Sequence, residues 1–222
     1  MAVFYTSNAI RESITLNLDA GTTDSYPGSG TTWYDLSRSG NNGTLTNGPT
    51  FSEGGISFDG SNDFCAISNI TLGNGNVAWT ISSWVKTTTA VNSLGAGSVI
   101  SNASGGPVYS MLGVNAGKIV YWTYQGGWSQ KLGVGTTVND GNWHMLTWVN
   151  NSNSTMAMYV DGALDSNVAN SSSGNNNPVD RVGGSWAASF DGRIATLKLY
   201  TQALSATVIS REYAITRGRF NR

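Results

Sequence analysis

The stretch that decides the fold runs from Asp140-Gly-Asn-Trp-His-Met-Leu-Thr-Trp148 to Tyr159-Val-Asp-Gly162. Two apolar runs, 143–149 and 156–160, have the length of strands, and Asp161-Gly162 closes the second. Asp-Gly suits a tight type I′ hairpin, because both central residues of that turn need positive φ. The stretch therefore predicts antiparallel β-structure that ends in a tight turn.

Further strands are expected on both sides of this stretch, at the regular spacing typical of a two-sheet sandwich. The apolar runs that predict them are 14–18, 44–46, 55–58, 63–67, 80–86, 98–101, 108–114, 118–124 and 195–200. The end of the chain alone is typical of a helix, because Ser205 can cap residues 206–217 and Gly218 is placed to end it. The pattern predicts an all-β, antiparallel jelly-roll sandwich with a short C-terminal helix.

The composition fits one large β domain of 222 residues, with 28 glycines and only 11% charged side chains. A formal net charge of −1 gives no electrostatic footprint for nucleic acid or for an anionic membrane, so neither is expected as a partner. The single Cys65 permits no intrachain disulfide. No signal peptide follows Met1, so the chain is expected to be made in a cytoplasm.

Four stretches together resemble the laminin G / concanavalin A-like lectin-glucanase superfamily. They are Gly55–Phe64, Trp79–Val85, Asp140–Gly162, and Phe190-Asp-Gly-Arg-Ile194 through Ser205. Their order over residues 14–216 implies two antiparallel sheets with chain ends that lie close together. We expect an N-terminal arm at 1–13, the sandwich at 14–204, and a C-terminal helix and tail at 205–222.

A narrower resemblance concerns both ends of the chain. The stretches Leu16–Gly21, Ser25–Leu36, Gly40–Pro49 and Tyr213–Phe220 look like lectin-like domains in structural proteins of tailed phages. This resemblance implies a virion protein that is made in the host cytoplasm. Because a fold does not fix a function, the implication is an analogy.

Catalysis is not expected. The sandwich hydrolases of this superfamily carry Glu-x-Asp-x-x-Glu on one strand, and the sequence has no such run. Its three glutamates are Glu12, Glu53 and Glu212, none of them in a predicted core strand. The only histidine, His144, lies inside a strand-like run, where a structural role is expected.

Two ligand sites can be named from the residues. Asp59, Asp63 and Asp161 offer oxygen ligands for calcium on predicted loops, and the alternative is that these carboxylates cap their own turns. Trp122, Tyr124 and Trp128 could form an aromatic platform for a sugar ring or a partner protein. The alternative is that both faces of this strand are packed, and the residues alone leave it open.

Two functions follow from these observations. The first is a capsid decoration protein on the virion surface, bound to capsid proteins or to further copies of itself, since no fibre shaft accompanies the domain. Its attachment is expected through the arm residues Val3, Phe4 and Tyr5 and the tail residues Arg217, Arg219 and Phe220. The second function is a carbohydrate-binding, lectin-like module that recognises a glycan through the aromatic platform.

Overall fold

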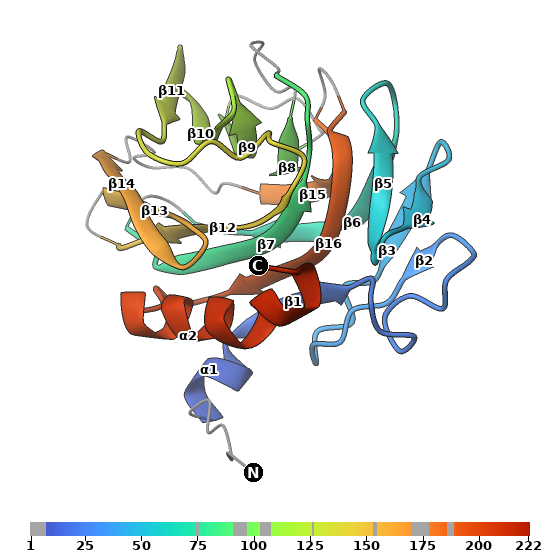
Figure 1. The fold of residues 1–222 in the computed structure, drawn as a ribbon. Helices are drawn as coiled ribbons and strands as arrows, with labels where there is room; N and C mark the ends of the chain where they lie inside the picture. Colours follow the sequence, from blue (N-terminus) through green and yellow to red (C-terminus); the bar gives the residue numbers. More distant parts are fainter. Residues whose placement is uncertain are drawn as a thin grey trace.

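The computed structural model describes residues 8–73, 76–90, 97–102, 108–125, 127–152, 155–169, 178–185 and 189–222. These residues form the all-β, two-sheet antiparallel sandwich that the sequence predicts, together with helices at its two ends (Figure 1). None of the helices in these ranges has the length and apolar character needed to cross a membrane.

The first sheet, called sheet A, contains eight of the described strands. Its strands follow the order β14 (Ala163–Ala169), β13 (Thr155–Val160), β12 (Trp143–Asn150), β7 (Trp79–Lys86), β16 (Asp191–Tyr200), β5 (Gly55–Asp59) and β4 (Thr50–Ser52). The eighth strand, β1 (Ile14–Asp19), pairs with the second half of β16, from Asp19 opposite Thr196 to Ile14 opposite Tyr200. This pairing places the first strand of the sandwich beside the last.

The second sheet, sheet B, also contains eight of the described strands, and all its pairs are antiparallel. The order is β11 (Trp128–Leu132), β10 (Lys118–Gln125), β9 (Val108–Asn115), β8 (Ser98–Ser101), β15 (Pro178–Val182), β6 (Phe64–Thr71), β3 (Gly43–Thr46) and β2 (Thr32–Trp33). The two sheets face each other across one large apolar core.

Strands β7 and β12 are buried on both faces. Alternate residues such as Ile81 and Trp148 point into the core between the sheets, whereas Trp84 and Met145 belong to a second apolar cluster on the outer face of sheet A. The helix α2 (Ala206–Thr216) covers this outer face (Figure 1). Because both faces are covered, every residue of β12 is buried.

The end of α2 differs from the prediction. Ser205 caps the helix as expected, since its side chain accepts a hydrogen bond from Val208 N. Gly218, however, does not end the helical structure, because the chain continues as the 3₁₀ helix η1 (Arg217–Phe220) and reverses at Asn221 with φ 55°. The additional turn brings Phe220 onto Trp84, with 4.2 Å between the ring centroids.

The two ends of the sandwich meet, as the superfamily resemblance implies: Thr201 N donates to Ser13 O at 2.8 Å. The short helix α1 (Asn8–Glu12) lies on the same side of sheet A as α2 (Figure 1). Its Ile10 packs against the cluster beneath α2, so this part of the N-terminal arm is tied to the domain. At the predicted hairpin, Asp161 and Gly162 have φ 52° and 78°, which confirms a turn with two left-handed residues.

Candidate functional site

Trp122 of the predicted aromatic platform is fully buried. It packs with Met111 and Val120 in a small cluster, whereas Tyr121 between them belongs to the main core. Because neighbouring residues of a strand point to opposite faces, the small cluster lies on the outer face of sheet B. Trp122 therefore follows the packed alternative, although its indole Nε1 has no hydrogen-bond partner.

The other two platform residues lie at the end of the β10–β11 pair. The backbone register places Tyr124 opposite Trp128 on one side and Tyr109 on the other. The side chains of Tyr124 and Trp128 lie outside the described residues. A binding platform at this edge of sheet B, formed by Tyr124 and Trp128 and not by the buried Trp122, stays a prediction.

The C-terminal residues proposed for attachment are engaged within the domain. Phe220 is 5% exposed and packs between Trp84 and Trp143. Arg219 forms an ion pair with Asp19 at 2.6 Å, and the Arg217 guanidinium lies 5.9 Å from the Tyr213 ring centroid. The arm residues Val3, Phe4 and Tyr5 lie outside the described residues. The tail is thus a packed part of the sandwich, and its proposed contact with a partner remains a prediction.

The calcium candidates Asp59 and Asp63 close their own loop, whereas Asp161 binds to the strand β12. Asp59 Oδ1 accepts a hydrogen bond from Ser61 N at 2.8 Å, and Asp63 Oδ2 accepts one from Asp59 N at 3.2 Å. Burial, together with the nearby charge of Asp59, raises the pKa of the Asp63 carboxyl. Asp161 Oδ1 accepts from Met145 N. In the described part of the chain, no three His, Cys, Asp or Glu side chains are grouped to hold a metal ion.

His144 of β12 connects two loops with the C-terminal residue Arg222. Its buried ring lies 2.8 Å from Asp161 Oδ2 and 3.1 Å from Asp140 Oδ1, and Arg222 Nη2 lies 2.8 Å from its Nε2. Burial opposes ionisation of Asp140, but hydrogen bonds from Asn142 and His144 outweigh it and lower the pKa of Asp140 to about 2. The contacts of His144 are those of a structural residue.

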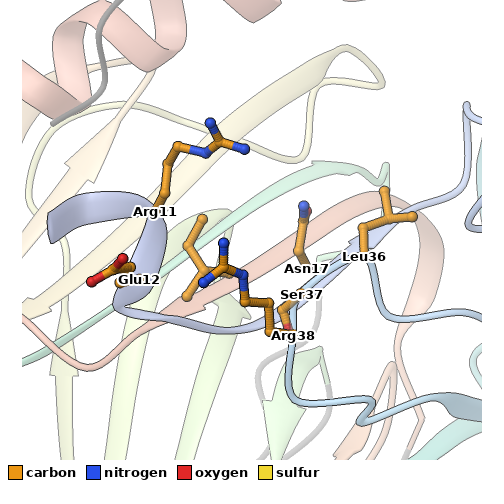
Figure 2. A pocket seen from close by; sticks show the side chains of 7 residues that line it. Arg11, Glu12, Asn17, Leu36, Ser37 and Arg38 are labelled. Carbon is orange, nitrogen blue, oxygen red and sulfur yellow. The ribbon is translucent and has the colours of Figure 1, made fainter. Parts of the chain in front are cut away.

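A polar pocket of about 260 Å³ lies where α1, β1 and the loop after β2 meet. Its walls are formed by Arg11, Glu12, Ile14, Asn17, Leu36, Ser37 and Arg38. Figure 2 shows Arg11 and Glu12 on the α1 side and Leu36, Ser37 and Arg38 on the loop side, with Asn17 between them. Two stretches of the chain, residues 11–17 and 36–38, thus contribute hydrogen-bonding side chains to one cavity.

The carboxylate of Asp35 fixes the loop wall of this pocket. Its Oδ1 accepts hydrogen bonds from Asn17 N and Ser37 N, both at 2.8 Å, so it ties the loop to β1. Its Oδ2 accepts from Ser37 Oγ at 2.7 Å and from Asn41 N at 2.9 Å. Leu36 N also donates to Asn17 O at 2.8 Å. The wall is therefore organised before any ligand arrives.

Several polar groups of the pocket have no partner within the described ranges. Arg11 and Arg38 are exposed and form no ion pair with a described residue. The Oδ1 atom of Asn17 is buried without a hydrogen-bond partner, which costs about 1–3 kcal/mol unless a ligand or water satisfies it. No pattern in the sequence predicts this site, since its residues converge only in the fold.

The described residues thus define an antiparallel two-sheet β-sandwich with a helix packed on one sheet. The family model of the concanavalin A-like lectin/glucanases superfamily matches residues 59–210. This match covers more than half of the chain, and the protein belongs to this superfamily. No curated protein is similar enough to count as a match.

Solved structures of toxin binding domains have a similar fold. The botulinum neurotoxin serotype D binding domain has a TM-score of 0.70 and 15% identity, with 93% of this chain and 53% of that chain covered. The binding domain of Paraclostridial Mosquitocidal Protein 1 has a TM-score of 0.64 and 14% identity, with 91% and 52% covered. At these identities the likeness shows the fold alone, and this chain spans about half the length of each neighbour.

A third similar structure belongs to botulinum neurotoxin type C, whose cell entry is dependent upon interaction with two ganglioside molecules. Its TM-score is 0.66 at 13% identity, with 93% of this chain and 52% of that chain covered. These neighbours share the two-sheet arrangement with the present chain.

Proposed function

We propose that this protein is a carbohydrate-binding, lectin-like module that holds a sugar residue in the pocket between α1, β1 and the loop after β2. The observation that carries the proposal is the pocket itself, where the buried Oδ1 of Asn17 lacks a partner beside the exposed Arg11 and Arg38. Its volume of about 260 Å³ is just below the range of about 300–1,000 Å³ for drug-sized ligands. A ligand of the size of one sugar ring suits this space.

The lining has the chemistry that a sugar requires. Each sugar hydroxyl both donates and accepts, and the amide of Asn17 and the carboxylate of Glu12 offer complementary groups. Ile14 and Leu36 supply apolar surface for the C–H groups of a ring, and Leu36 is 40% exposed. Because Asp35 holds the loop in place, binding needs little additional ordering of the chain.

The pocket suits recognition better than hydrolysis. A glycosidase places two carboxyl groups on either side of one bond, and the described lining contains one carboxylate, Glu12. The two other glutamates are paired elsewhere, Glu53 with Lys86 and Glu212 with Lys198, each at 2.7 Å. These pairings support a binding role without catalysis.

The similar structures support the same choice between the two functions predicted from sequence. The type C toxin interacts with gangliosides, and another neighbour is a binding domain in complex with rat synaptotagmin II. A glycan or protein partner is thus consistent with this fold. Capsid decoration and a place in the virion stay predictions from the sequence resemblance, and no contact among the described residues favours them over glycan recognition.

A glycan microarray followed by titration calorimetry tests the proposal. We expect the wild type to bind a defined set of glycans and Asn17→Ala to lose that binding while its melting temperature stays close to the parent. The matched control is Asn167→Ala, which removes an exposed amide from the edge strand β14 and should leave binding unchanged. An array without any bound glycan, or full binding by Asn17→Ala, would contradict the proposal.

A further inference from the structure

The charges around the pocket suggest which sugars it takes. Arg11 and Arg38 stand at its two sides, and neither forms an ion pair with a described residue. Arg193 and Arg219, in contrast, form ion pairs, with Glu53 at 3.3 Å and with Asp19 at 2.6 Å. Two unpaired guanidinium groups beside one cavity form a site for an anion.

The carboxylate of Glu12, the third charged group of the lining, indicates how much negative charge the ligand carries. Two positive charges, Arg11 and Arg38, and one negative charge, Glu12, give the pocket a net charge of +1. A group with a single negative charge neutralises this lining, whereas a doubly charged group would leave the occupied pocket with a net charge of −1. Carboxylates and sulfate esters carry one charge, whereas a phosphate monoester carries nearly two at neutral pH.

The remaining lining groups select for a sugar that bears the anion. A guanidinium binds a carboxylate or a similar oxyanion through two parallel N–H donors. The unpartnered Asn17 Oδ1 accepts a hydrogen bond and therefore needs a donor, which an anionic oxygen cannot supply but a neighbouring hydroxyl can. One anionic group and adjacent hydroxyls on a single ring satisfy all three side chains.

We infer that the pocket recognises an acidic sugar, a glycan residue that carries one carboxylate or one sulfate ester beside free hydroxyls. The inference rests on the proposed function and names the ligand class for the same site. Arg38 on the fixed loop and Arg11 on α1 bind the anionic group, and Asn17 accepts from a hydroxyl of the ring.

Arg38, on the loop side of the pocket in Figure 2, is the better residue to change first. It leaves the loop that Asp35 ties to β1, so its backbone position is set by the fold. Its side chain is exposed, so replacing it should not disturb the core. Arg11 provides the second variant from the opposite wall.

The test is calorimetric titration of the full chain with matched oligosaccharides that differ in one ring: glucuronic acid, glucose, sulfated glucose or glucose phosphate. We expect the carboxylated or the sulfated ligand to bind at least about tenfold more tightly than the neutral one. Arg38→Gln and Arg11→Gln should each lower that affinity about tenfold, and Glu12→Gln should raise it. Added salt should weaken binding of the acidic ligand but not of the neutral one.

The matched control is Arg211→Gln, an exposed arginine of α2 outside this lining, which makes the same change in net charge. An equal loss in Arg211→Gln would mean that overall charge attracts the ligand and would overturn the inference. Equal affinity for glucuronic acid and glucose, or tightest binding of the phosphate monoester, would overturn it as well. If glucuronic acid and glucose bind equally well but Asn17→Ala loses this binding, the proposed function still holds and only the preference for an acidic sugar is wrong.

Discussion

Replacing Phe220 by alanine should destabilise the whole domain, although this residue is third from the C-terminus. Its ring is 5% exposed and stacks on Trp84 at 4.2 Å with 20° between the planes. It also contacts Trp143, with the centroids 5.2 Å apart. Replacing a buried phenylalanine by alanine lowers the free energy of unfolding by about 3–5 kcal/mol. Because this site lies at the edge of the outer cluster, we expect the lower value, about 3 kcal/mol.

For a domain of this size, each kcal/mol lowers the melting temperature by about 2–4 °C, so Phe220→Ala should melt about 6–12 °C below the wild type. A chain truncated after Thr216 should melt lower still, since it also loses the Arg219–Asp19 pair. Calorimetry and urea unfolding measure both. Ile215→Ala, at a 52% exposed position of α2, is the control and should change stability by less than about 0.5 kcal/mol. Equal melting of Phe220→Ala and Ile215→Ala would refute this packing argument.

Three further predictions concern single side chains. Asp35→Asn should lower the free energy of unfolding by about 1–3 kcal/mol in urea titrations and weaken glycan binding; unchanged binding in a folded variant would speak against a fixed pocket wall. Since the pKa of Asp140 falls from 3.8 to about 2 on folding, its charge adds stability that is complete above pH 3.8 and is lost as the pH falls through about 2. The difference in urea midpoint between wild type and Asp140→Asn should therefore shrink over that range, and a constant difference would contradict the role of these hydrogen bonds. Burial raises the pKa of the Cys65 thiol, so a thiol reagent should label it only after unfolding, and rapid labelling of the native protein would show that β6 opens.

The strands that pack into the core could be predicted from the sequence, because alternation of apolar residues reports burial on one face. The expected run 98–101 is strand β8, and 118–124 lies within β10. Five of the described strands were missed: β2, β4, β11, β14 and β15. In β14 the residues Ala163 to Ala169 are exposed or half-buried, so backbone pairing with β13 holds the strand without an apolar pattern.

The outer layer of the domain could not be predicted in the same way. Apolar residues on both faces of β7 indicate burial, but they do not say that α2 and Phe220 cover one of them. Gly218 was expected to end the helix because glycine adopts left-handed φ easily, yet Asn221 takes that role. The stacking of Phe220 on Trp84, which no local pattern contains, accounts for the extra turn.

The candidate site depended still more on the fold. Arg11, Asn17 and Arg38 form no sequence motif, and they share a pocket only because β1 carries α1 to the loop after β2. The aromatic run around Trp122 indicated a binding platform more clearly, but aromatic side chains also pack in protein cores. The structure resolves this ambiguity for Trp122, which is buried.

An NMR titration of the wild-type protein with the tightest-binding glycan of the array tests the location of the site most directly. The chemical shifts to follow are the side-chain amide of Asn17, the backbone amides of Ser37 and Arg38, and the backbone amides of Tyr124 and Trp128. If the pocket binds the sugar, the largest shift changes occur at Asn17, Ser37 and Arg38. If the changes gather at Tyr124 and Trp128 and leave Asn17 unmoved, the sugar binds at the edge of sheet B and the proposed pocket is wrong.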